Sequence, residues 1–194
     1  MVESTTERSQ PMKGLRPLYF YLIVALVFVC DQITKALIQR SMAFGEYRQI
    51  LGPNVMLSLT QNTGGAWGIL PSENRVFVAF AAVAIVALLF AYHRIARGDL
   101  LVGSAFALAM GGALGNLLDR LRYGYVVDFF AVRIVHYHWP IFNVADSAIS
   151  FGIILLLLHY IRSFRAEANE SGNSHVSTAA PNIAADDLTK KAHE

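Results

Sequence analysis

The stretch VFVAFAAVAIVALLFAY, residues 76–92, decides the fold class because it contains no charged or strongly polar side chain. A helix satisfies its own backbone hydrogen bonds, so an apolar helix of this length can cross a bilayer. A second uncharged stretch, LLVGSAFALAMGGALGNLL at residues 100–118, follows after a tight link. The sequence therefore predicts two neighbouring membrane-spanning helices that run in opposite directions.

Two further apolar runs bring the set to four. Residues Leu18–Ile38 continue past Asp31 with helix-forming residues, and as a helix they would extend about 31 Å. The run Ala148–Ile161 is shorter than a full span, so we expect the polar Asp146 and Ser147 just before it to belong to the same helix. The predicted fold class is an all-α membrane protein with four transmembrane helices.

Composition agrees with a chain whose solvent is partly lipid. Of the 194 residues 55% are hydrophobic and only 15% are charged, whereas about a quarter are charged in a typical soluble domain. The net charge of +2 and the lack of a basic run interleaved with aromatics argue against a nucleic-acid partner. The single cysteine, Cys30, excludes an internal disulfide and a cysteine-built metal site.

The start of the first run also has features of a cleavable signal peptide. Lys13 and Arg16 precede an apolar stretch, as in such a peptide. No small-x-small cleavage site follows, and the residues before Cys30, VFV at 27–29, are too bulky for a lipoprotein processing site. Since three more apolar runs follow, we expect this segment to be retained as the first transmembrane helix.

The chain divides into one membrane domain and two tails. Residues 1–16 are polar, residues 17–165 hold the four predicted spans, and residues 166–194 are rich in Ala, Ser, Asn and Asp. We expect the last segment to be disordered because it has few large apolar side chains. Basic residues crowd into the shorter segments on the side of the termini, which favours a cytoplasmic location for both tails.

A small β-sheet is expected between the helices. Val55–Thr60 partly alternates between apolar and polar residues and runs into the turn-forming stretch Asn62–Gly65. Val126–Tyr137 is rich in β-branched and aromatic residues and could pair with it. The two segments predict a sheet and loop cradle on one face of the membrane, the extracytoplasmic face if the tails are cytoplasmic.

Small residues recur at a spacing of four in the third run. Gly103, Ala107, Gly111 and Gly115 would form a strip along one helix face. Such strips let transmembrane helices approach closely, although glycine is also common in membrane helices for other reasons. The strip therefore concerns packing and not chemistry.

Carboxylates gather at one end of the predicted bundle. Four spans alternate in direction, so the end of the first, the end of the third and the start of the fourth share a face. The polar residues on that face are Asp31, Asp119, Asp128 and Asp146, with Asn62, Asn116 and Asn143. Carboxylates at membrane depth are costly and usually functional, the alternative being solvated helix ends.

The four acids differ in their neighbours. Asp31 has Lys35 one helical turn ahead, and Asp119 adjoins Arg120, so both resemble braced ionic groups. Asp128 and Asp146 have only apolar neighbours and no cation nearby in the sequence. Burial raises the pKa of a carboxyl group, and two carboxyl groups that share a site lose their protons in separate steps. One acid of this pair could therefore be protonated while the other is ionised at the same pH.

A singly protonated carboxyl pair can hydrolyse a peptide bond. The ionised partner takes a proton from the attacking water, while the protonated partner polarises the carbonyl and later protonates the leaving nitrogen. Neither a metal, a cofactor nor a nucleophilic side chain is required. Asp128 and Asp146 are the candidate catalytic pair.

Five short motifs then support a family resemblance. In chain order they are Asp31-x-x-x-Lys35, Asn62-Thr63-Gly64-Gly65-Ala66, Gly115-Asn116-Leu117-Leu118-Asp119-Arg120, Val127-Asp128-Phe129 and Phe142-Asn143-Val144-Ala145-Asp146-Ser147. Together, over residues 18–162, they resemble bacterial lipoprotein signal peptidase (signal peptidase II). Gly65 and Trp67 depart from the alanine and phenylalanine expected in this family.

The resemblance implies an aspartyl endopeptidase of the cell inner membrane. Such an enzyme removes the signal peptide from prolipoproteins by cutting before a diacylglyceryl-modified cysteine near the outer, periplasmic face. It implies membrane lipid as surroundings, a monomer and no metal, with Asp128 and Asp146 as the catalytic pair. The supporting or substrate-binding positions it implies are Asp31, Lys35, Asn62, Gly64, Asn116, Asp119, Arg120 and Asn143.

More specific roles follow as hypotheses. Asn62 and Trp67 would line the substrate entrance, and Asn143 would orient Asp146. Arg120 would fix loop backbone or Asp119 and would not touch the scissile bond. Apolar helix faces would hold the lipid of the substrate, while the sheet clamps the extended peptide by strand pairing.

Three other functions are weighed. A metal-dependent hydrolase could use His136 and His138, which would point the same way on a strand, together with Asp128, but no His-Glu-x-x-His helix exists. A transporter would place its acids along a path through the midplane, in place of a cluster at one face. A non-catalytic scaffold would tolerate asparagine at both acids of the pair.

Overall fold

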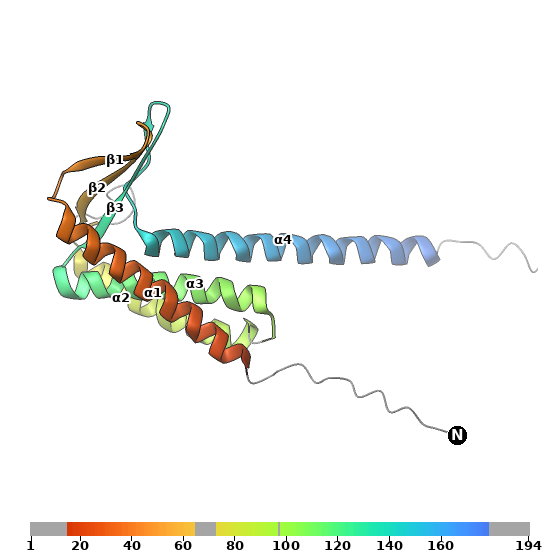
Figure 1. Cartoon of the computed structure of the whole chain (residues 1–194). Coiled ribbons are helices and arrows are strands. Elements are labelled where there is room, and N and C mark those ends of the chain that lie inside the picture. Colours follow the sequence, from red (N-terminus) through yellow and green to blue (C-terminus); the bar gives the residue numbers. More distant parts are fainter. Residues whose placement is uncertain (1–14, 65–72, 97, 179–194) are drawn as a thin grey trace, which may run out of the picture. The chain divides into compact units, whose positions relative to one another are not determined.

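The computed structural model describes residues 15–64, 73–96 and 98–178, with side chains over residues 17–166 of these ranges (Figure 1). The elements in chain order are α1 (Leu15–Ser41), β1 (Tyr47–Leu51), β2 (Val55–Asn62), α2 (Asn74–Ala91), the π-helical turn η2 (Tyr92–Ala96), α3 (Leu100–Tyr123), β3 (Val126–Ile134), β4 (Tyr137–His138) and α4 (Val144–Thr178). Residues 1–156 and 157–194 form two compact units. All the features described below belong to the first unit unless stated otherwise.

Four helices in the described part of the chain are long and apolar enough to cross a membrane. They comprise Pro17–Ser41, Asn74–Ala96, Leu100–Tyr123 and Val144–Ala166. Few of their residues are buried apart from those of the third, as expected for helices with lipid as solvent. The prediction of four membrane-length helices is confirmed, and the fourth begins before Asp146, so its polar start does complete the span.

The last helix extends further than the sequence indicates. Residues 166–194 are predicted to be disordered, whereas α4 continues to Thr178. Ala166, Glu167 and Ala168 favour helix, and extending a formed helix costs little compared with starting one. In the second unit the side chains of residues 157–166 are mostly exposed. Residues 179–194 lie outside the described residues, as does the N-terminal tail up to residue 14.

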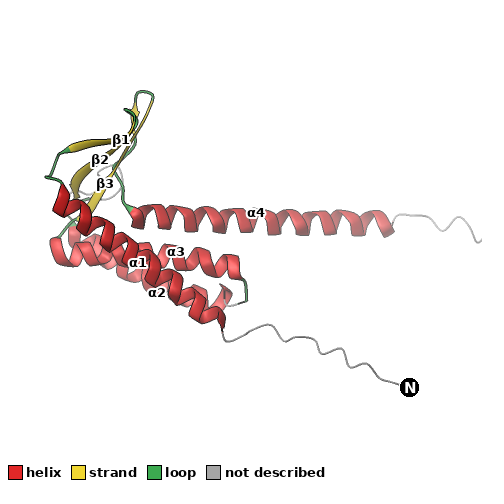
Figure 2. Ribbon diagram, viewed as in Figure 1, coloured by secondary structure: helices red, strands yellow, loops and turns green. Residues whose placement is uncertain are grey.

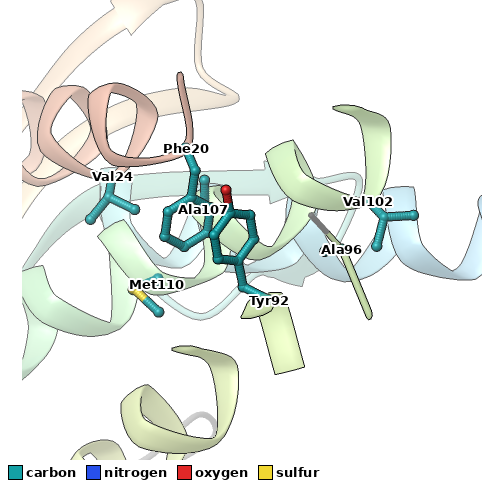
Figure 3. Close-up of a cluster of buried hydrophobic side chains, with 7 residues drawn as sticks. All are labelled: Phe20, Val24, Tyr92, Ala96, Val102, Ala107 and Met110. Atoms are coloured by element: carbon teal, nitrogen blue, oxygen red, sulfur yellow. The ribbon is translucent and has the colours of Figure 1, made fainter. Parts of the chain in front are cut away.

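One apolar cluster joins α1, η2 and α3 at the end of the bundle away from the sheet. Phe20 of α1 stacks on Tyr92 with 3.6 Å between the ring centroids. Figure 3 shows these rings beside Ala107 and Met110 of α3. Ala107 belongs to the predicted strip of small residues, so the strip does lie in the packed interface.

Three glycines of α3 are positions of close approach. A Cβ on Gly111 would lie 2.7 Å from Cβ of Val27 in α1, and a Cβ on Gly115 would lie 2.5 Å from Oδ2 of Asp31. Gly112, which is not part of the predicted strip, meets the backbone of Ala145 at the start of α4. Both α1 and α4 therefore reach α3 only because these positions lack a side chain.

The strands form an antiparallel sheet in the order β1-β2-β3-β4 (Figure 2). The predicted pairing of the two segments is confirmed, with Thr60 opposite Asp128 and Val55 opposite Val132. The predicted strand Val126–Tyr137 is interrupted, since β3 ends at Ile134 and Val135 adopts φ +56° in a turn to β4. The sheet lies at the end of the bundle where α1 and α3 end and α4 begins, as Figure 1 shows.

Replacing Gly111 by alanine is expected to destabilise the bundle by about 1–3 kcal/mol, because the added methyl group would overlap Val27. The measurement is the thermal unfolding midpoint of the purified protein in detergent. Gly103→Ala is the matched control on the same helix, because a Cβ there would meet its nearest atoms at 3.6 Å, an ordinary contact. Equal midpoints for the two variants would contradict the close approach of α1 and α3.

Candidate active site

Asp128 and Asp146 line one cavity of about 940 Å³ at the sheet end of the bundle. Asp128 is presented by β3, and Asp146 lies in the first turn of α4. The apolar side chains that line the cavity are Trp139, Pro140, Ile141, Phe142, Ile149, Phe151 and Ile154. The other lining residues are Thr60, Gln61, Asn62, Thr63, Gly64, Ser147 and Ser150. The predicted pair is therefore brought together in a largely apolar cavity.

The carboxylate of Asp128 is 2% exposed and accepts two amide hydrogen bonds. Asn62 Nδ2 donates to its Oδ2 at 2.8 Å, and Asn143 Nδ2 donates to its Oδ1 at 2.7 Å. Burial, followed by the negative charge of Asp146, raises the pKa of Asp128 to about 7, against the smaller opposing effect of the two amides. Asp128 can therefore hold a proton near neutral pH.

Asp146 is held by a reciprocal cap at the start of α4. Its backbone N–H donates to Oδ1 of Asn143 at 2.9 Å, and the Asn143 N–H donates to Oδ2 of Asp146 at 3.2 Å. Asn116 Nδ2 donates to the other carboxylate oxygen at 2.7 Å. A helix N-terminus also favours a negative charge, so this carboxylate is fixed in direction and well supplied with donors.

Asn143 contacts both acids. Its side-chain nitrogen donates to Asp128 while its side-chain oxygen and backbone N–H engage Asp146. The contact with Asp146 was predicted from the sequence. The contact with Asp128 was not predicted, because the sequence around Asn143 does not indicate that β3 lies next to it.

The remaining acids surround a buried ammonium group. Lys35 Nζ lies 2.8 Å from Oδ2 of Asp31 and 2.8 Å from Oδ2 of Asp119. The helical pairing with Asp31 is as predicted, but Asp119 pairs with Lys35 and not with the adjacent Arg120. Neighbours in a helix sequence point in different directions, so Asp119 faces α1 while Arg120 faces away from it.

The side chain of Arg120 contacts the backbone of Gly64 and the first residues of α2. Its guanidinium donates to the carbonyl oxygen of Gly64 at 2.6 Å and to Oδ1 of Asn74 at 3.4 Å, and it lies 4.4 Å from the ring centroid of Phe77. The Gly64 N–H in turn donates to Oδ1 of Asn62. Of the two predicted partners of Arg120, the loop backbone is thus the one observed.

Two polar contributors were missed. Gln32 Nε2 donates to Asp119 at 3.1 Å and to Asp31 at 3.2 Å, and Asn74 Nδ2 donates to the Arg120 carbonyl. Both residues have ordinary sequence surroundings, and only the packing of α1, α2 and α3 gives them these partners. Trp67, predicted at the substrate entrance, lies outside the described residues.

The histidines weighed as metal ligands are exposed. His136 lies in the turn after β3 and His138 in β4, so they do not share one strand as the metal hypothesis assumed. Among the residues that the structure describes, no three His, Cys, Asp or Glu side chains gather closely enough to hold a metal ion.

Arg120→Ala is expected to lower the free energy of unfolding by about 2 kcal/mol, because the Gly64 carbonyl and Asn74 lose a charged donor. Chemical or thermal unfolding in detergent measures this loss. Arg48→Ala is the control, because the Arg48–Glu46 pair is exposed and contributes about 0–1 kcal/mol. An unchanged stability of Arg120→Ala would refute the anchoring role.

Known proteins similar to this chain show the family to which it belongs. The family model described as signal peptidase (SPase) II matches residues 23–162. A lipoprotein signal peptidase of Bacillus velezensis is 38% identical over 142 residues, which cover 73% of this chain and 93% of the relative. One of Halothermothrix orenii is 41% identical over 139 residues, covering 72% and 92%.

Two solved structures share the fold. Both are described as bacterial membrane enzymes solved by the in meso method, at 2.3 Å and 1.9 Å resolution. The first superposes with a TM-score of 0.72 at 33% identity over 75% of this chain and 89% of the other. The second gives 0.68 at 34% identity over 73% and 92%.

Four membrane-length helices together with the match to signal peptidase II define the class as an integral membrane protease of the aspartic type. The chain belongs to the signal peptidase II family.

Proposed function

We propose that the chain removes the signal peptide from prolipoproteins, cutting before the diacylglyceryl-modified cysteine, with Asp128 and Asp146 as the catalytic pair. The observation that carries the proposal is the bridging of the buried Asp128 and the partly buried Asp146 by Asn143 at the wall of the cavity. The substrate class comes from the relatives, whose names are lipoprotein signal peptidase.

The two acids have different tasks. Asp128, with its pKa raised to about 7, is the proton holder and donates a hydrogen bond to the carbonyl oxygen of the scissile bond. Asp146, at the start of α4 with two N–H donors, is the ionised base that takes a proton from the attacking water. The carbonyl becomes tetrahedral, and the leaving nitrogen receives a proton as the C–N bond breaks.

The cavity accounts for a substrate that is both peptide and lipid. One wall of the cavity is formed by the end of β2, where Asn62 lies, and by the segment Trp139–Phe142. These two segments would flank an extended peptide. The other wall follows α4 through Ile149, Phe151 and Ile154, whose apolar side chains suit a signal-peptide helix or an acyl chain.

The proposed setting is the cell inner membrane, with the catalytic pair near its outer, periplasmic face. The acids and the sheet lie at one end of the bundle, whereas the η2 turn that holds His93 and Arg94 lies at the other. Basic segments remain cytoplasmic, so this arrangement supports cytoplasmic termini.

Asp128→Asn and Asp146→Asn are each expected to reduce cleavage on the order of 10³-fold, because asparagine keeps the shape but neither holds nor accepts the transferred proton. The measurement is cleavage of a diacylglyceryl-modified prolipoprotein by the purified chain in detergent, with chelator present. Asp99→Asn is the matched control. Asp99 caps α3 through its side-chain oxygen, a role that asparagine fills equally well.

Three outcomes would contradict the proposal. Cleavage by both folded variants would remove the pair from the mechanism. Loss of wild-type cleavage on adding chelator would favour a metal hydrolase. Failure of the wild type to cut this substrate would overturn the substrate class.

The pH profile of kcat/KM is expected to fall as the pH rises through about 7, by about tenfold per unit, because Asp128 then loses the proton that it must donate. Since the Asn62 amide lowers the pKa of Asp128, Asn62→Ala should move this alkaline limb to higher pH. A limb in the same place in both proteins would show that a different group sets it.

A further inference from the structure

Lys35 uses all of its donors on three different partners. It is 2% exposed, and an ammonium group has three N–H bonds. Two go to Asp31 and Asp119 at 2.8 Å each, and the third goes to Oδ1 of Asn116 at 3.0 Å. The third contact is not an ion pair, so neutralising the two acids does not account for it.

That third contact decides which way the Asn116 amide points. Its oxygen accepts from Lys35 and from Asn143 Nδ2 at 3.1 Å, and its nitrogen donates to Asp146 at 2.7 Å. Turning the amide over would place its oxygen against the Asp146 carboxylate and its NH₂ against the ammonium group. The turned NH₂ would also face the NH₂ of Asn143. All of these contacts would be repulsive, and the strongest is with the ammonium charge, so the cation is the main constraint on the orientation of the amide.

The other two asparagines that contact the catalytic pair also have their amide oxygen held by a donor, but this donor is a backbone N–H group. Asn62 has its oxygen held by the Gly64 N–H at 3.1 Å, and Asn143 has its oxygen held by the Asp146 N–H at 2.9 Å. In both cases backbone fixes the amide, so no side-chain substitution removes the constraint directly. Asn116 is the one of the three whose orientation is set by a side-chain charge from another helix.

We propose that Lys35 is a positioning residue for the reaction: it holds the Asn116 amide so that Nδ2 donates to Asp146 and keeps that carboxylate ready to accept a proton from water. This inference rests on the proposed function of the pair. Without the cation, Asn116 can present its oxygen to Asp146. The carboxyl group then gains by keeping its own proton and donating to that oxygen, so the base is lost at neutral pH.

The expected signature is in the acid limb of the kcat/KM profile, where the base of the pair ionises. In Lys35→Met this limb should move to higher pH by about one unit, with about tenfold slower cleavage on that limb. The charged groups that also act on the pair or on the ammonium group stay in place: Asp31 on α1, Asp119 and Arg120 on α3, Asp128 on β3 and Asp146 on α4.

A double-mutant cycle with Asn116→Leu distinguishes a positioning role of Lys35 from a purely structural one. Asn116→Leu removes the amide and leaves Lys35 between its two acids. The purified full chain, the diacylglyceryl-modified substrate and detergent are used throughout, with thermal unfolding recorded for every variant. The ammonium charge also acts on the pair directly, so some shift is expected in both backgrounds. If Lys35 acts mainly through Asn116, Lys35→Met moves the limb clearly further in the wild-type background than in Asn116→Leu. Should Lys35→Met not fold, the neutral triple variant Asp31→Asn/Lys35→Met/Asp119→Asn takes its place and is compared with Asp31→Asn/Asp119→Asn, so that only Lys35 differs between the two.

Two results would overturn the inference. One is a uniform loss of rate with no movement of the limb, as expected if Lys35 only stabilises the fold. The other is an equal shift of the limb in both backgrounds, as expected if its charge acts on the pair directly. The activity of Asp128→Asn and Asp146→Asn tells failure of this inference apart from failure of the proposed function. If both variants are inactive, either result leaves the proposed function intact. If both variants cleave the substrate, the proposed function itself is wrong.

Discussion

The ammonium group of Lys35 is the contact on which the arrangement of the site depends. A buried charge must be paired, and this one is shared by Asp31 of α1 and Asp119 of α3. The same two acids reach further elements, since Asp31 accepts the Ala145 N–H at 2.9 Å and Asp119 accepts the Val127 N–H at 3.1 Å. One cluster of charges thus fixes the starts of α4 and β3, and Asp146 and Asp128 each follow by one residue.

Close helix packing makes this cluster possible. Gly115 lies against the carboxylate of Asp31 and Gly112 against the backbone of Ala145, so α3 presents almost no bulk where α1 and α4 meet it. The absence of bulk lets Asp31 of α1 and Asp119 of α3 share the ammonium group of Lys35 and lets the start of α4 lie against α3. Asp128 on β3 is itself buried, and this burial raises its pKa.

The sequence predicts what is local or periodic. The four spans follow from uncharged runs, the sheet from two strand-forming segments, and the Asp31–Lys35 pair from a helical spacing of four. The partner of Asp119 could not be predicted in this way, because Lys35 is distant in the chain and the adjacent Arg120 is the more obvious cation. Gln32 and Asn74 were missed for the same reason, since tertiary contact alone makes them part of the site.

The proposed chemistry requires one carboxyl group of the pair, Asp128, to keep its proton close to neutral pH. Infrared difference spectroscopy of the purified chain during a pH titration tests this without substrate. We expect a protonated carboxyl band that disappears as the pH rises through about 7 and that is missing in Asp128→Asn. A band that has already disappeared near pH 4, where an ordinary aspartic acid ionises, or one that persists in Asp128→Asn, would contradict it.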